Sequence, residues 1–184
     1  MRAFVAVRVP ATREIEAVLK SLAGMQPAVK VVAADQLHVT LKFLGETDES
    51  LLPFLSAMIQ EVAGGEFKCR VNLGGLGAFP RIERPTVVWA GMSGADVLNR
   101  LAAEFEERSA TLGFARETRP FEPHVTLARV KFKPPAALAK LLRDKRCEAF
   151  GSVDVEAVEL VQSDLLRSGS QYSRLMSAAL SAAD

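Results

Sequence analysis

Histidine occurs only twice in this chain, and both copies lie in the same tetrapeptide, His-Val-Thr-Leu. The first copy begins at His38 and the second at His124, so nearly half of the 184 residues separate them. Imidazole is the side chain whose ordinary pKa lies closest to neutral pH, where it can give or accept a proton. The repeat therefore predicts two related halves that each supply one titratable imidazole to a shared site.

On a β-strand, each tetrapeptide would place its histidine and threonine on one face and its apolar side chains on the other. Residues i and i+2 of a strand share a face. His38 then lies beside Thr40 and His124 beside Thr126, while the valines and leucines point the other way. A hydroxyl can donate a hydrogen bond to a phosphoryl oxygen while the neighbouring imidazole transfers a proton. The pattern suits a site for an oxyanion with a proton to move.

Two other interpretations of the histidines have to be weighed. A single histidine among apolar residues is more often structural than catalytic, but repetition of the whole string favours function. A metal site would need about three or four protein ligands, and no His-rich or Cys-rich spacing is present. Cys69 and Cys147 give no disulfide framework, and we expect them to be inert core residues. We expect no metal and no cofactor.

Composition indicates a folded globular chain with an ordinary charge balance. Hydrophobic residues make up 49% and charged residues 24% of the sequence, and the formal net charge is +1. Proteins that bind long duplexes usually carry a strong basic excess, so we expect only a few phosphates to be bound. No apolar run approaches the ~20 residues of a membrane span. The first residues alternate like a strand and lack the long apolar core of a secretory signal, so we expect a cytoplasmic protein. A monomer is the default expectation.

Periodicity and turn residues predict strands interspersed with four helices. The helices are expected over residues 12–24, 48–62, 95–112 and 134–145. The strands are expected over residues 2–9, 29–33, 37–44, 67–76, 86–92, 124–130, 152–163 and 172–179.

The connections favour antiparallel pairing. The link from Ala33 to Leu37 is too short for a parallel crossover, and no glycine-rich phosphate loop of a common type is present. We expect an α+β fold with two mostly antiparallel sheets facing a central groove and helices outside. Residues 1–184 would form a single bilobal domain with one His-x-Thr motif in each lobe.

A set of short strings, in order along the whole chain, resembles a known family. They are MRAFVAV (1–7), HVTLKFLGE (38–46), GAFP (77–80), VVWAG (87–91), FEPHVTLAR (121–129), and Gly169 with Tyr172. The sequence resembles the two-histidine (2H) phosphoesterase superfamily, and within it the bacterial and archaeal RNA 2′,3′-cyclic phosphodiesterases, also called 2′-5′ RNA ligases. The bare His-x-Thr motif is unspecific, whereas the ordered set is specific.

The resemblance implies a bilobal, pseudo-symmetric fold that opens a terminal 2′,3′-cyclic phosphate with water, without a metal, and leaves a 2′-phosphate. His38, Thr40, His124 and Thr126 match the family's catalytic positions, and Arg129 matches a basic phosphate contact. Strict alternation would turn Arg129 away from His124, so a bulge or the end of the strand is required there.

Opening the ring requires a base for the water, an acid for the departing ribose oxygen and donors for the other phosphoryl oxygens. We assign His124 as the base and His38 as the acid, although the symmetry of the motifs leaves the reverse open. Joining of RNA ends through a 2′-5′ linkage would be a secondary activity.

Two alternatives remain at the level of sequence. One is a module that binds RNA ends or nucleotides without turnover, and the other is a cyclic phosphodiesterase for a non-RNA nucleotide such as ADP-ribose cyclic phosphate. The partners are therefore RNA ends or small cyclic nucleotides. Phe43, Phe79 and Phe132 are candidates for stacking on a base, although alternation places Phe43 on the apolar face with the core.

Overall fold

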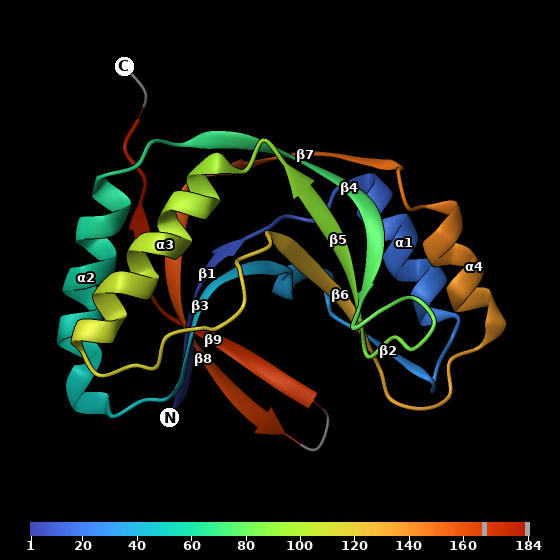
Figure 1. The fold of residues 1–184 in the computed structure, drawn as a ribbon, viewed down its shortest axis with the longest axis horizontal. Coiled ribbons are helices and arrows are strands. Elements are labelled where there is room, and N and C mark those ends of the chain that lie inside the picture. Colours follow the sequence, from blue (N-terminus) through green and yellow to red (C-terminus); the bar gives the residue numbers. More distant parts are fainter. Residues whose placement is uncertain (167–168, 183–184) are drawn as a thin grey trace.

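The first sheet contains the first and the last strand and the first histidine motif. The computed structural model describes residues 1–166 and 169–182, and the sheet has the strand order β3-β1-β8-β9 with antiparallel neighbours (Figure 1). The strands span His38–Glu46 (β3), Arg2–Arg8 (β1), Ala157–Leu166 (β8) and Gly169–Ala179 (β9). The first motif thus lies in an edge strand, paired on one side with β1.

The second sheet contains the second motif. Its five strands have the order β2-β6-β5-β4-β7, again with antiparallel neighbours. They span Val29–Val31 (β2), His124–Val130 (β6), Val87–Ser93 (β5), Cys69–Phe79 (β4) and Ala149–Val155 (β7). Strands β3 and β6 contact each other, which brings the two motifs together from different sheets.

Four helices cover the outer sides of the sheets (Figure 1). They are α1 (Arg13–Ala23), α2 (Leu52–Gly64), α3 (Asp96–Thr111) and α4 (Ala136–Asp144), with short 3-10 helices at Ala34–Gln36 and Glu49–Leu51. Helices α2 and α3 pack on the first sheet, and α1 and α4 on the second. Thr12 caps α1 by accepting a hydrogen bond from the backbone N–H of Ile15, as a threonine before a helix commonly does.

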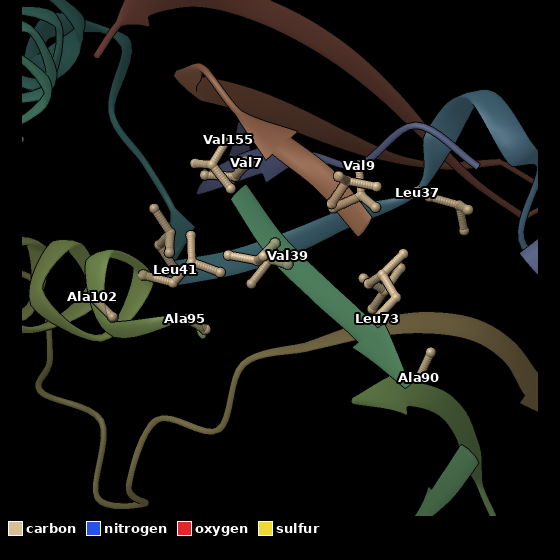
Figure 2. Close-up of a cluster of buried hydrophobic side chains, with 14 of the residues drawn as sticks. Val7, Val9, Leu37, Val39, Leu41, Leu73, Ala90, Ala95, Ala102 and Val155 are labelled. Atoms are coloured by element: carbon tan, nitrogen blue, oxygen red, sulfur yellow. The ribbon is translucent and has the colours of Figure 1, made fainter. Parts of the chain in front are cut away.

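One hydrophobic core joins the two sheets and all four helices. Alternate residues of β1 and β3, such as Val7 and Val39, meet Leu73 of β4 and Ala90 of β5 in it (Figure 2). Burial of a valine or leucine side chain contributes roughly 1.5–3 kcal/mol to the stability of the fold. Because the core occupies one face of each sheet, the opposite face is left for the polar residues of the motifs.

The fold class is confirmed, with two corrections to the strands. The predicted strand over residues 152–163 is two strands, β7 and β8, which belong to different sheets and are separated by Glu156. The predicted strands on either side of Asp35 do not pair with each other, because a 3-10 helix at Ala34–Gln36 sends β2 and β3 into different sheets. The short link was therefore no sign of a hairpin, although the conclusion that the sheets are antiparallel holds.

No helix within residues 1–166 and 169–182 combines the length and the apolar content that crossing a bilayer requires.

Candidate active site

The two histidine rings are held in the same way. Nδ1 of His38 lies 2.8 Å from the carbonyl oxygen of Gln36, and Nδ1 of His124 lies 2.6 Å from that of Glu122. A carbonyl can only accept, so each Nδ1 donates its proton to the carbonyl two residues earlier. Nε2 is then the ring nitrogen available to a substrate, as a lone pair in the neutral ring or as a donor in the protonated ring.

The predicted alternation of faces is confirmed in both motifs. Val39, Leu41, Val125 and Leu127 are buried in the core. The histidines and threonines of the two motifs are half-buried on the opposite faces. Each sheet therefore presents an imidazole next to a hydroxyl, as the sequence predicts.

A β-bulge in β6 brings Arg129 to the face of the second motif. In the pairing of β5 with β6, Trp89 lies opposite Thr126 and Val88 lies opposite Ala128, so Leu127 is an extra residue. Leu127 and Ala128 are both buried, and Arg129 is exposed. The bulge resets the alternation by one residue, so Arg129 points to the same side as His124 and Thr126. This is the irregularity that the sequence required for Arg129.

The same bulge occurs at the same place in β3. Val5 lies opposite Lys42 and Ala6 opposite Thr40, which leaves Leu41 as the extra residue. Lys42 is buried, and Phe43 is 66% exposed. The prediction that Phe43 packs in the core is therefore wrong, because the bulge turns its ring to the side of His38.

Aromatic rings flank both histidines. Phe4 and Tyr172 lie 4.9 and 5.1 Å from the ring of His38, with Tyr172 edge-on. Phe79 and Trp89 lie 5.0 and 6.1 Å from the ring of His124, with Phe79 edge-on. Phe4, Trp89 and Tyr172 were not predicted as site residues, since their approach depends on strand register.

The other two candidate stacking residues differ in position. Phe79 contacts both Trp89 and His124. Phe132 is 65% exposed, and it takes part in none of the ring contacts found among residues 1–166 and 169–182. Phe43 is exposed as well, but its ring lies 6.2 Å from that of Phe4, which contacts His38.

The surroundings of His38 lower its pKa below the ordinary value of 6.5. Burial is the largest cause, because it disfavours the charged ring, and the positive charges of Arg129 and His124 add to it. The hydrogen bond to Gln36 and the negative charge of Glu159 act in the opposite direction. Arg129 and His124 of one sheet thus act electrostatically on His38 of the other, and the neutral form of His38 is favoured at neutral pH.

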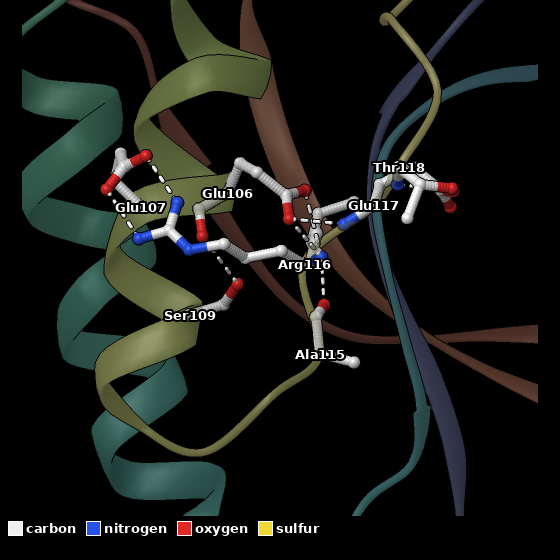
Figure 3. A network of polar contacts seen from close by, with 8 residues as sticks. Glu106, Glu107, Ser109, Ala115, Arg116, Glu117 and Thr118 are labelled. Carbon is white, nitrogen blue, oxygen red and sulfur yellow. Dashed lines mark hydrogen bonds and ion pairs between the residues drawn. The ribbon is translucent and has the colours of Figure 1, made fainter.

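A polar network connects the bulge in β3 to the segment that leads into the second motif. The ammonium of Lys42 donates to Glu106 Oε1 at 2.9 Å and to the carbonyl of Ala115 at 2.7 Å. The same Glu106 oxygen accepts the backbone N–H of Glu117, and Arg116 pairs with Glu107 on α3 (Figure 3). The segment before His124 is therefore fixed to both α3 and β3.

In the part of the chain that the structure describes, no three or more His, Cys, Asp or Glu side chains are grouped so that they could hold a metal ion. Burial raises the pKa of the half-buried Cys69 thiol, which disfavours the reactive thiolate. Cys147 is exposed rather than in the core.

Comparison with known proteins agrees with this arrangement. A model of the 2′-5′ RNA ligase superfamily matches residues 9–166. The chain belongs to this superfamily. An RNA 2′,3′-cyclic phosphodiesterase of Aeropyrum pernix is 40% identical over 157 residues, which cover 84% of this chain and 88% of that protein. One from Archaeoglobus fulgidus is 38% identical over 177 residues, covering 95% and 98%.

Solved structures of other proteins share the fold. The protein TT0787 of Thermus thermophilus superposes with a TM-score of 0.80 at 33% identity, covering 98% of each chain. LigT of E. coli complexed with 3′-AMP superposes with a TM-score of 0.74 at 30% identity, covering 97% of each chain. The resemblance seen in the sequence to the 2H phosphoesterases is confirmed.

Proposed function

We infer that this chain hydrolyses the 2′,3′-cyclic phosphate ends of RNA or nucleotides to 2′-phosphates. The observation that carries the inference is the pair of imidazoles, held in matching orientation within electrostatic reach of each other. The curated relatives, several of them named RNA 2′,3′-cyclic phosphodiesterase, support the same reaction.

The reaction needs one neutral and one protonated imidazole. Since burial favours the neutral form of His38, we assign His38 as the base and His124 as the acid, the reverse of the sequence-based assignment. His38 takes a proton from water as the water oxygen attacks phosphorus. The bond from phosphorus to the ribose 3′ oxygen breaks, and His124 donates a proton to that oxygen. The products are a 2′-phosphate and a 3′-hydroxyl, and each proton transfer is typically worth ~10²–10⁴-fold in rate.

Thr40, Thr126 and Arg129 are the proposed contacts for the non-bridging phosphoryl oxygens. Both hydroxyls share a face with a histidine, and the bulge brings the guanidinium of Arg129 to the same face as His124. Donors aimed at oxygens that gain charge in the transition state lower the barrier directly. The exposed ring of Phe43 offers a surface on which the terminal base can stack.

Ligation is the same step with a different nucleophile. A 5′-hydroxyl of a second RNA in place of water would attack the cyclic phosphate, displace the 3′ oxygen and form a 2′-5′ linkage. The name of the superfamily model favours this as a second activity.

The test is incubation with a nucleoside 2′,3′-cyclic phosphate, followed by ³¹P NMR of the product. We expect a 2′-monophosphate signal, unchanged by a chelator because no step uses a metal. A bound nucleotide with no monophosphate would favour the non-catalytic module, and loss of turnover with EDTA that zinc restores would favour a metal enzyme.

A further inference from the structure

The face of the first sheet that carries His38 also carries two arginines that the proposed reaction does not use. Arg8 lies directly opposite His38 in the pairing of β1 with β3. Side chains of directly opposite residues share a face, with Cβ atoms about 5 Å apart. The guanidinium of Arg8 therefore starts next to the proposed base, on the same side of the sheet.

Arg174 reaches this face from the far edge of the sheet. It lies opposite Val161 in the pairing of β8 with β9, and Val161 lies opposite Phe4, whose ring contacts His38. Arg174 also follows Tyr172 by two residues on β9, and the ring of Tyr172 contacts His38 edge-on. The face that carries His38 on β3 and Arg8 on β1 thus continues across β8 to Arg174 on β9.

A single carboxylate holds both arginines. Oε1 of Glu159 accepts a hydrogen bond from Nη1 of Arg174 at 3.2 Å and lies 3.6 Å from Nε of Arg8. Glu159 is 7% exposed and lies opposite Ala6, which itself lies opposite Thr40. The two arginine side chains are each 55% exposed. The carboxylate is therefore buried beneath two guanidiniums that still face solvent.

This cluster is built to bind an anion. One carboxylate neutralises one guanidinium, so a positive charge remains on the face beside His38. Each guanidinium also has several N–H donors in a planar fork that fits two phosphate oxygens. Glu159 holds the two cations at a fixed separation, which reduces the side-chain entropy lost when they bind a ligand.

We propose that Arg8 and Arg174 form a second phosphate subsite, which binds the phosphodiester on the 5′ side of the terminal nucleotide while His38 and His124 act on the cyclic phosphate. This rests on the proposed function. An RNA strand that ends in a cyclic phosphate continues only through its 5′ oxygen, so its next anion is one nucleotide away. The preferred substrate is then an oligonucleotide rather than a free cyclic nucleotide.

The test compares two substrates with the same terminal nucleotide. One is the nucleoside 2′,3′-cyclic phosphate with a free 5′-hydroxyl, and the other is the dinucleotide that ends in the same cyclic phosphate. In the parent protein, we expect kcat/KM to be higher for the dinucleotide. In Arg8→Ala and Arg174→Ala, the ratio of the two kcat/KM values should fall about tenfold, as loss of a charged hydrogen bond implies.

Lysine variants and a remote arginine provide the controls. Arg8→Lys keeps the charge and should recover part of the ratio. The dependence of the dinucleotide rate on salt should weaken in each alanine variant, because salt screens an exposed attraction between a guanidinium and a phosphate. Arg70→Ala removes an exposed arginine that pairs with Asp154 on the second sheet, and it should leave the ratio unchanged.

The outcomes separate the subsite from the reaction. The subsite would be overturned if the ratio stayed unchanged in both alanine variants, whether kcat/KM fell equally on both substrates or on neither. The arginines would then serve only to pair with Glu159. A parent protein that turns over neither substrate would overturn the proposed function instead.

Discussion

At the scale of single residues, the site depends on how each imidazole is oriented. The carbonyls of Gln36 and Glu122 fix Nδ1 of the two rings, and aromatic rings contact each imidazole. This support leaves Nε2 as the ring nitrogen available to a substrate in both halves. Burial and nearby cations act on His38 to favour its neutral form.

The lowered pKa of His38 predicts the acid side of the pH profile. A base works only when deprotonated, and the pKa of His38 lies below 6.5. The rise of kcat/KM with pH should therefore have its midpoint below pH 6.5. In Glu159→Gln, the loss of a negative charge that raises this pKa should move the midpoint to still lower pH. A pH-rate series on a cyclic nucleotide measures both, and a midpoint above 6.5 or a shift to higher pH would contradict the assignment of His38.

Gly77 allows Trp89 to lie beside His124. A Cβ atom at position 77 would come within 2.2 Å of the Trp89 ring. Gly77→Ala should therefore displace this ring and lower kcat/KM by about 10- to 100-fold, since small misplacements are costly in catalysis. The fluorescence of Trp89, the only tryptophan, should change as well. Gly64→Ala is the matched control, because nothing lies within 4 Å of its Cβ position. Normal activity and fluorescence in Gly77→Ala would refute this role.

At the scale of elements, paired bulges connect the motifs to their surroundings. Each bulge comes directly after the His-Val-Thr string and turns the residue five positions after the histidine to the site, Phe43 in one sheet and Arg129 in the other. The bulge in β3 also buries Lys42, which then bonds to the segment before His124. One irregularity thus supplies a site residue and a link between the motifs.

Replacement of Lys42 tests this link. Lys42→Ala should lower the free energy of unfolding by about 2–3 kcal/mol, less than the ~3–5 kcal/mol typical of a broken buried pair, because Glu106 remains partly exposed. Lys140→Ala, which removes an exposed helical pair with Asp144, should cost about 0.5 kcal/mol or less. Urea denaturation of both variants measures the two values, and equal losses would show that the Lys42 network contributes little.

The sequence predicted those features that follow from local pattern. The strand alternation in His38-Val39-Thr40-Leu41 and the amphipathic helix around Leu98 and Leu101 are examples. It could not place Phe43, because nothing in the string Leu-Lys-Phe distinguishes a bulge from a regular strand. The division at Glu156 was missed for a similar reason, since the alternating apolar and polar residues over 152–163 read as one strand whether or not the chain changes sheets. Arg8, Glu159 and Arg174 are brought together only by strand order.

At the scale of the whole molecule, the two motif-bearing sheets share one core. The cluster that contains Val39 and Leu41 also contains Val125 and Leu127. We propose that residues 1–184 act as a single bilobal domain, because the large core spans both sheets and the separate cluster on the first sheet, Phe4, Ala6 and Val161, is small.

A shared core predicts one cooperative unfolding transition. Trp89 reports on the second sheet and Tyr172, the only tyrosine, on the first. Their near-ultraviolet signals and the far-ultraviolet circular dichroism should give the same urea midpoint. Separate midpoints for Trp89 and Tyr172 would mean that the lobes unfold independently.

The central claim is that two imidazoles act on one phosphorus atom as base and acid, and substitution of the leaving atom tests it most directly. His38→Ala and His124→Ala should each lower the turnover of a 2′,3′-cyclic phosphate by about 10²–10⁴-fold. A substrate with sulphur in place of the 3′ oxygen expels a thiolate, which needs no acid, so it should restore turnover in His124→Ala and not in His38→Ala. Rescue of His38→Ala alone would reverse the two roles, and full activity of either variant on the normal substrate would contradict the account.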